Sequence, residues 1–183
     1  MPTDDQDVVE LLTEQHRQIR TVFDELATAT GKDRVEAFRR LVRLLAVHET
    51  AEEEVVHPAV HKADGGEPVV AARVAEERRA KELLSTMDGI GPDAEGFDTL
   101  LVQLRDDVLA HAEHEEREEF PLLRATYDAE RLRDMAKAVR AAESIAPTRP
   151  HPGVEGQAAN LLLGPPAAIM DRARDLIRNV LGR

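Results

Sequence analysis

Two segments of this 183-residue chain carry histidine, glutamate and proline in the same arrangement. Each has a histidine followed by glutamate at +4 and +5 and by proline at +10: His48, Glu52, Glu53 and Pro58 in the first, and His111, Glu115, Glu116 and Pro121 in the second. In a helix, residues four apart lie one turn apart on the same face. Imidazole together with carboxylate suits iron, manganese or zinc. The repeat therefore predicts a metal site assembled from two helices.

The two histidines also share the apolar register of their helices. Apolar residues precede each histidine by 10, 7 and 3 positions: Phe38, Leu41 and Leu45 in the first segment, and Leu101, Leu104 and Val108 in the second. This spacing is typical of the buried face of a helix, so each histidine and the glutamate at +4 continue that face. A buried carboxylate is costly unless a cation neutralises it. The shared register favours metal binding over the ordinary alternative, a solvated acidic helix face.

The helices that precede the two segments each offer one further ligand. His16 is followed by apolar residues at +3, +7 and +10, and Glu77 is the position in the third helix with the same pattern. The His-x-x-x-Glu unit begins 32 residues after His16 and 34 residues after Glu77. The chain is thus predicted to form two hairpins, each with one ligand from its first helix. The alternative for Glu77 is a surface glutamate paired with Arg73 or Lys81.

Helix-forming residues dominate the chain, and Gly or Pro interrupts them at few places. Four long helices are predicted: from an N-cap at Asp4 or Asp5 to Gly31, from Asp33 to about Ala63, from Pro68 to about Asp88, and through residues 100–121. We expect an all-α fold, an up-down-up-down antiparallel four-helix bundle with additional C-terminal helices. The bundle is assigned to residues 1–127 and an extra helix to residues 128–145.

The last part of the chain, residues 146–183, is predicted to be a Pro-rich linker followed by an amphipathic helix. That helix places five residues on one apolar face: Ile169, Ala173, Leu176, Ile177 and Val180. The face is expected to dock on the bundle or on a second copy of the chain, or to bind a partner protein. Its polar face is mixed in sign rather than basic, which disfavours a membrane surface.

Composition excludes several classes of function. The 24 Lys+Arg against 36 Asp+Glu give a net charge of −12, which argues against a nucleic-acid partner. The chain has no cysteine, so disulfides, zinc fingers and iron–sulfur clusters are excluded. No apolar run approaches the roughly 20 residues of a membrane span, and the acidic N-terminus shows no signal peptide. A cytoplasmic location is expected by elimination.

The residues around His16, the segment HETAEEEVVHP at 48–58 and the segment HAEHEEREEFP at 111–121 resemble the hemerythrin-like family of HHE cation-binding proteins. The resemblance covers roughly residues 8–125, and the tail is similar to the extension of actinobacterial members. It implies two iron ions in a non-haem Fe–O–Fe type centre, with manganese or zinc as alternatives. His16 and His48 would bind one ion and His111 the other, with Glu52 and Glu115 bridging them.

The resemblance implies O₂ binding, or the sensing or handling of peroxide or nitric oxide, in an oxidative-stress role. The family expects histidine in the third helix, where this chain has Glu77. An anionic carboxylate favours the ferric state, which shifts the expectation from O₂ carriage to redox chemistry. If the chain is an enzyme, we expect a peroxide-decomposing, catalase- or peroxidase-like oxidoreductase. The alternatives are a metal-dependent sensor without catalysis and a bundle that binds a redox-silent metal.

The remaining histidines are weaker candidates. His114 with Glu118 is a rival His-x-x-x-Glu pair, but the apolar register favours His111. His57 and His61 lie roughly opposite His48 on an ideal helix, so a surface position is expected for both. A kink at Pro58 would turn His57 inward. His151, in the proline-rich linker, is expected to be exposed.

Overall fold

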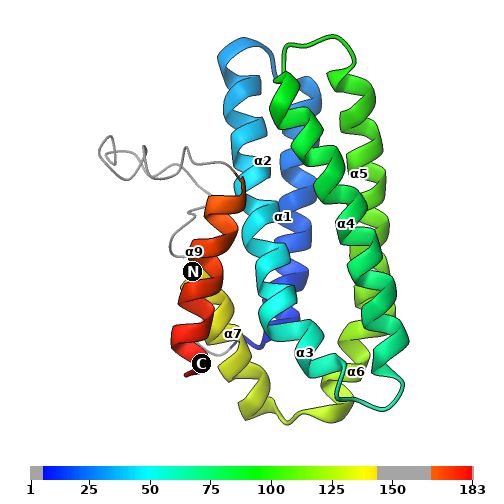
Figure 1. The fold of residues 1–183 in the computed structure, drawn as a ribbon, viewed down its shortest axis with the longest axis vertical. Helices are drawn as coiled ribbons and strands as arrows, with labels where there is room; N and C mark the ends of the chain where they lie inside the picture. Colours follow the sequence, from blue (N-terminus) through cyan, green and yellow to red (C-terminus); the bar gives the residue numbers. More distant parts are fainter. Residues whose placement is uncertain (1–5, 144–165, 183) are drawn as a thin grey trace.

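The computed structural model describes residues 6–143 and 166–182, and all regular structure in these ranges is helical. Four long helices form an antiparallel bundle (Figure 1): α1 (Val8–Thr28), α2 (Gly31–Ala51), α4 (Gly66–Ile90) and α5 (Phe97–His114). The predicted fold class is confirmed. None of the described helices is both long and apolar enough to cross a membrane.

Local sequence fixes where the helices begin and end. α1 begins with a capping box, in which the Asp7 carboxylate accepts from the Glu10 amide and Glu10 accepts from the amide of Asp7. The N-cap is therefore Asp7, and the prediction of Asp4 or Asp5 was wrong. The turn before α4 places Gly65 at a φ of 76° and the turn before α5 places Gly96 at a φ of 85°, a region that favours glycine.

Each of the two repeated segments contains a π-helical turn. α2 continues through η1 (Glu52–Val56) into α3 (His57–Val60), and α5 continues through η2 (Glu115–Glu119) into α6 (Phe120–Thr126). The amide of the residue after each turn donates to a carbonyl five residues back, His57 to Glu52 and Phe120 to Glu115. A proline follows at once in both, and its ring excludes the ordinary bond to residue i−4. The repeated proline thus accounts for an inserted residue in each helix.

Two further helices cover one side of the bundle (Figure 1). α7 (Ala129–Glu143) packs on α1, and α9 (Pro166–Leu181) packs on both α2 and α7. Ile169, Ala173 and Ile177 of α9 are buried, as the apolar face predicts. Val180 was predicted to lie on the same buried face, but it is 50% exposed because it lies in the last turn of the helix. The predicted linker and His151 lie outside the described residues.

The apolar core is divided into two layers. One includes Phe23, Leu41 and Leu104 in the half of the bundle that holds the α1–α2 and α4–α5 turns. The other includes Leu12 and Leu123 and extends to the apolar faces of α7 and α9. The repeated His-x-x-x-Glu units lie along their helices between these layers. Any polar group at that level is therefore shielded from water on both sides.

Docking of α9 gives a first testable prediction. Ile177→Ala should lower the free energy of unfolding by roughly 2–5 kcal/mol, because it leaves a cavity at a fully buried site between α9 and the bundle. Urea denaturation followed by circular dichroism measures the change. Val180→Ala on the same helix is the control, with an expected effect below about 0.5 kcal/mol. Equal effects of the two substitutions would contradict the docked arrangement.

Candidate metal centre

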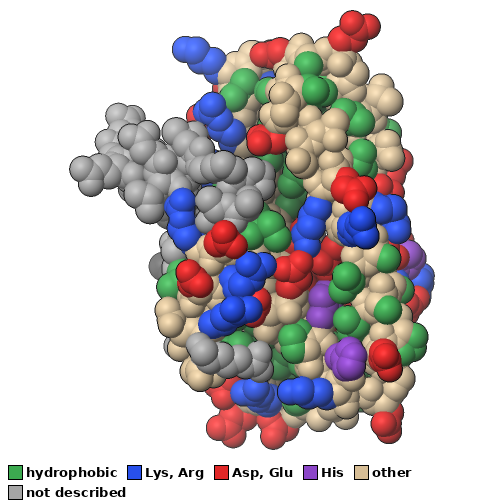
Figure 2. Space-filling view, viewed as in Figure 1, with side chains coloured by type: hydrophobic (Ala, Val, Ile, Leu, Met, Phe, Trp, Pro, Cys, Tyr) green, Lys and Arg blue, Asp and Glu red, His purple; other side chains and the backbone are tan. Residues whose placement is uncertain are grey.

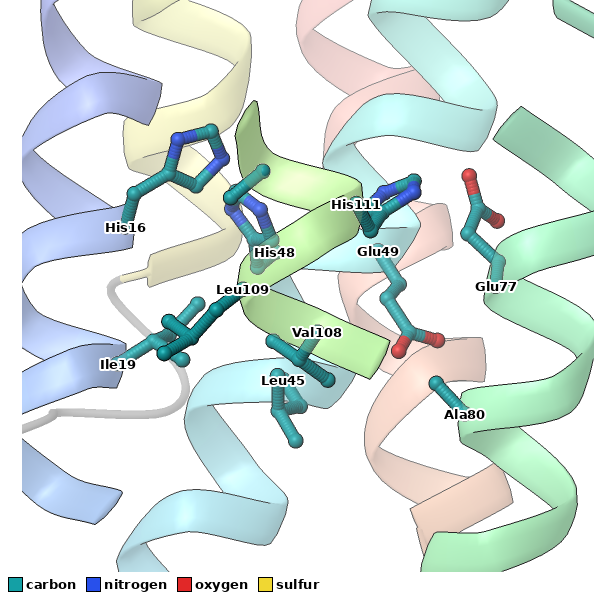
Figure 3. A pocket seen from close by; sticks show the side chains of 11 residues that line it. His16, Ile19, Leu45, His48, Glu49, Glu77, Ala80, Val108, Leu109 and His111 are labelled. Carbon is teal, nitrogen blue, oxygen red and sulfur yellow. The ribbon is translucent and has the colours of Figure 1, made fainter. Parts of the chain in front are cut away.

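A layer of buried polar side chains lies across the bundle between its two apolar layers. It contains all six residues that the sequence pattern selects: His16, His48, Glu52, Glu77, His111 and Glu115. Their ligand atoms form two groups, each within 4.8 Å: His16, His48, Glu52 and Glu115, and Glu52, Glu77 and His111. Figure 3 shows His16 beside His48, and His111 facing Glu77 on α4. The groups share one residue, the Glu52 of the π-turn, and ligation by the six stays a prediction.

The first group joins α1, α2 and both π-turns. His16 Nε2 lies 3.2 Å from Oε2 of Glu115, and His48 Nε2 lies 2.9 Å from Oε1 of Glu52. The two imidazole rings meet edge to face, with centroids 4.8 Å apart. Both carboxylates have no exposed surface, and the rings are almost fully buried. Two imidazole nitrogens and two carboxylates therefore converge on one small volume.

The second group lies on the α4–α5 side, and the other oxygens of Glu52 and Glu115 face its histidine. His111 Nε2 is 3.7 Å from Oε2 of Glu52 and 3.5 Å from Oε1 of Glu115. Glu77, from α4, is 2% exposed. The alternative in which Glu77 lies on the surface is therefore wrong, although Lys81 does contact its Oε2 at 3.4 Å. Because Glu52 and Glu115 direct one oxygen to each side, each would offer a ligand atom to a cation bound on either side.

Hydrogen bonds at Nδ1 fix the orientation of every histidine in the layer. His16 donates to Glu116 at 2.8 Å and His111 donates to Glu76 at 3.0 Å. The Nδ1 of His48 donates to the Gln15 side-chain oxygen at 2.7 Å, and the Gln15 amide in turn donates to Glu143 at 2.7 Å. Such partners hold the ring and set the tautomer of a metal-binding histidine.

This tautomer creates an electrostatic conflict that a cation resolves. With the proton on Nδ1, a neutral ring directs the lone pair of Nε2 at the carboxylate oxygens. Among the described residues, none donates a hydrogen bond of normal geometry to the four oxygens of Glu52 and Glu115. The Nε2 atoms of His16 and His111 are likewise buried and without such a bond. Nε2 lone pairs and carboxylate oxygens that face one another in a buried layer repel. A cation bound between them would remove this repulsion, so these residues fit a metal pair.

Protons take up part of this charge when no metal is bound. Burial and the neighbouring carboxylate of Glu52 raise the pKa of Glu115 well above its usual value. Burial opposes a charge on His111, but the carboxylates of Glu115 and Glu52 outweigh it and raise the pKa of His111 to about 12. Burial lowers the pKa of His16, so its ring is neutral at pH 7. Burial also opposes the charge of Glu52, yet His48 and His111 hold its pKa well below the ordinary range.

His57 is buried, and the predicted surface position was wrong. Its side chain is 6% exposed, its Nδ1 donates to Glu119 at 2.8 Å, and its Nε2 contacts Oε1 of Glu77. The residue inserted by the π-turn rotates this position by about 100° towards the interior. As in the other three histidines, Nδ1 of His57 has a polar partner and Nε2 faces a carboxylate. It is therefore a candidate seventh ligand, next to Glu77.

Glu119 is a buried carboxylate that the sequence pattern did not select. It is fully buried, and its Oε2 accepts no hydrogen bond from the described residues. It lies eight residues after His111, roughly 80° away on an ideal α-helix. The inserted residue of η2 reduces this angle to roughly 20°, which brings Glu119 onto the buried face. Pro121 at +10 was the signal that could have indicated the insertion.

The remaining histidines lie outside the layer. The His114 side chain is 34% exposed and donates to Glu76 at 2.9 Å, so it supports the site from outside. The side chain of its predicted partner, Glu118, is 41% exposed. His61 is exposed, as the sequence predicts. The geometry thus agrees with the preference for His111 over His114.

A small pocket lies beside the layer, between α1, α2, α4 and α5 (Figure 3). Its apolar wall is formed by Ile19, Leu45, Ala80, Val108, Leu109 and Ala112. His16, His48, His111 and Glu77 line its polar side, together with Glu49. Burial raises the pKa of Glu49 to about 8, although the charge of Lys81, 3.5 Å away, opposes this shift. A small ligand in the pocket would touch apolar atoms on one side and the polar layer on the other.

Comparison with known proteins identifies relatives of this arrangement. Residues 7–123 match the family described as hemerythrin HHE cation binding domain. A DNA nickase from Nostoc sp. is 28% identical over 141 residues, which are 76% of this chain but 40% of the relative's length. The chain therefore spans less than half of that protein. A crystal structure of a hemerythrin HHE cation-binding domain-containing protein from Mycobacterium kansasii has a TM-score of 0.69 at 18% identity, covering 96% of this chain and 99% of that chain.

The protonation of the layer predicts how metal affinity depends on pH. Affinity for Zn²⁺ should rise between about pH 6 and 9, because protons must leave the ligand atoms before a cation binds. The pKa is raised in the metal-free protein for Glu115, for His111 to about 12, and for His57 to about 10, where burial is outweighed by Glu119 and Glu77. Each proton displaced adds about tenfold in affinity per pH unit. Competition with a chromophoric chelator measures this, and a pH-independent affinity would contradict the protonated layer.

Proposed function

Because the chain belongs to the hemerythrin HHE cation-binding domain family, we propose that it holds two iron ions as a non-haem di-iron protein. The proposed centre binds or reacts with O₂, peroxide or nitric oxide, in a redox or oxidative-stress role. When bound, a pair of iron ions supplies two neighbouring metals that each change oxidation state by one electron. The polar layer contributes the ligand atoms, their orientation and the exclusion of water.

The observation that carries the proposal is the sharing of Glu52 between two groups of ligand atoms. One buried carboxylate cannot serve two separate sites without holding the two cations close together. Glu115 faces both sides in the same way, at 3.2 Å from His16 and 3.5 Å from His111. A set of imidazoles and carboxylates without thiolate favours iron, manganese or zinc over softer metals. These contacts support a paired site.

The pocket supports a small, weakly polar ligand such as O₂, peroxide or nitric oxide. Its wall is apolar, and the imidazoles of His16, His48 and His111 line the opposite side. The Glu49 carboxyl lies beside them, and burial raises its pKa to about 8. A carboxyl with a raised pKa can supply a proton to a ligand that gains negative charge. Proton supply next to the layer favours reduction of the ligand over simple carriage.

The carboxylate of Glu77 supports the same preference. An anionic donor at this position stabilises the more highly charged ferric ion relative to the ferrous ion. Reversible O₂ carriage needs a stable ferrous state, so redox chemistry or sensing is favoured. The nickase activity of the Nostoc relative is a property of that protein. The net charge of −12 disfavours contact with DNA by this chain.

Metal analysis with an optical spectrum tests the proposal. Protein expressed in iron-replete medium should contain about two metal ions per chain, because the two groups share Glu52. A ferric pair should give near-ultraviolet absorption that decays or shifts on mixing with peroxide, nitric oxide or, after reduction, O₂. Two zinc ions without such absorption would favour the redox-silent alternative. Well under one metal per chain would refute the metal centre altogether.

Substitution of Glu77 tests its role as a ligand. Glu77→Gln should lower metal content or shift the spectrum and raise the reduction potential, because an anionic donor becomes neutral. Glu77→His should restore metal content with a higher potential, since imidazole is also neutral but binds well. Glu82→Gln is the control on the same helix, where the side chain is 67% exposed. Wild-type metal content and spectrum in Glu77→Gln would show that this carboxylate is not a ligand.

A further inference from the structure

Three consecutive glutamates occupy the π-turn η1, and each is held by a different partner. Glu52 faces the polar layer and is fully buried. Glu53 contacts Lys81 of α4 at 2.5 Å, and Glu54 contacts two arginines of α9. Three adjacent carboxylates repel one another, and a π-turn is a rare departure from the α-helix. The cations that bind Glu53 and Glu54 therefore help to keep Glu52 in place.

The contact between Glu54 and α9 is the most complete of these. Arg178 forms two hydrogen bonds with the two oxygens of Glu54, both at 3.0 Å. Arg174 donates to Oε1 of Glu54 at 2.9 Å, and Asp171 fixes its guanidinium from the other side at 3.0 Å. The Glu54 side chain is 14% exposed and that of Arg178 is 51% exposed, so the carboxylate is more shielded from water than the guanidinium of Arg178. A bidentate guanidinium fixes the orientation of a carboxylate more strictly than a single hydrogen bond does.

Arg174 is also connected to the metal layer through Glu53 and Lys81. Arg174 lies 3.5 Å from Oε2 of Glu53, whose other oxygen binds Lys81. Lys81 in turn contacts Glu77 at 3.4 Å and Glu49 at 3.5 Å. Figure 2 shows basic and acidic side chains interleaved over α9 and the adjoining bundle. A continuous set of polar contacts thus connects α9 with Glu77 in the metal layer and with Glu49 beside it.

The second π-turn, η2, is held differently. Its Glu116 accepts from His16 of α1, and its Glu119 accepts from His57. Arg73 of α4, itself buried, lies 3.7 Å from Glu118. All of these partners belong to the bundle helices and their π-turn segments. Only η1, among the two turns described here, depends on a helix outside the bundle and outside residues 7–123.

We propose that Arg174 and Arg178 of α9 are positioning residues for the metal centre, because they hold the π-turn that carries the shared ligand Glu52. This inference rests on the proposed metal-binding function and extends it to a helix outside the matched family domain. Coupling of this kind is reciprocal. A cation that fixes Glu52 must therefore also strengthen the docking of α9, and loss of the cation must weaken it.

The full chain carrying Arg174→Gln and Arg178→Gln tests the proposal, with Zn²⁺ as the probe so that redox chemistry is not needed. Competition with a chelator should show at least about tenfold weaker Zn²⁺ binding than in the wild type. The sign of this change is informative. Removing two positive charges near a cation site strengthens cation binding if charge alone acts through space. A loss of affinity therefore indicates positioning, whereas unchanged or tighter binding would overturn the inference.

Matched variants separate positioning from general destabilisation. Arg20→Gln with Arg39→Gln removes two exposed arginines of the bundle and should leave Zn²⁺ binding within about twofold. Arg174→Lys with Arg178→Lys keeps the charge but loses the bidentate geometry. This variant should therefore bind Zn²⁺ more tightly than the glutamine variant but more weakly than the wild type. If the glutamine variant does not fold, this lysine variant carries the test. Wild-type affinity in the lysine variant would overturn the requirement for guanidinium geometry.

Hydrogen exchange of the α9 amides supplies a second, independent measurement. In the wild type, Zn²⁺ should slow exchange in α9, and in the glutamine variant this effect should be lost. Zn²⁺-independent exchange in wild-type α9 would overturn the coupling. The experiment distinguishes failure of the proposed metal binding from failure of this inference. If the wild type binds no Zn²⁺ in the competition assay, both proposals are refuted. Zn²⁺ binding without coupling would refute the inference alone.

Discussion

The structure depends on the burial of two carboxylates, Glu52 and Glu115, at the centre of a helical bundle. Neither has exposed surface, and their oxygens face buried imidazole nitrogens without accepting a hydrogen bond of normal geometry from the described residues. An uncompensated buried charge is among the most expensive features a fold can contain. Protons on His111 and on Glu115 offset part of this cost when no metal is bound. Bound cations would offset it more completely, so folding and metal binding would stabilise the same arrangement.

The surroundings of the layer follow from that constraint. Apolar layers on both sides exclude water, which strengthens the attraction between the ligand atoms and a cation. Each buried imidazole has an outer partner at Nδ1, so its ring cannot turn away from the layer. The π-turns bring additional polar groups, His57 and Glu119, to the same level. The proline after each turn stabilises the insertion, because proline cannot donate the α-helical hydrogen bond to the carbonyl of residue i−4.

The two halves of the bundle are similar in sequence but are stabilised unequally. η2 is surrounded by partners within the bundle, whereas η1 faces α9 and takes its arginines. η1 has three consecutive glutamates, of which Glu53 contacts Lys81 of the bundle and Glu54 contacts the two arginines of α9. α9, which follows the bundle in the sequence, thus helps to hold the π-turn that carries Glu52. The family match ends at residue 123, so this contribution of α9 lies outside it.

The sequence by itself determined the helices, their antiparallel order and the six residues of the polar layer. Those features depend on periodicity, since an apolar residue every three or four positions defines a buried face that His16, His48 and His111 continue. His57, Glu119 and the partners of Glu54 were decided only by the tertiary structure. An inserted residue shifts the helical register, and a contact between residues 120 positions apart, such as Glu54 with Arg174, leaves no local pattern. Periodicity identifies which face of a helix is buried, but only the packed structure identifies which groups meet there.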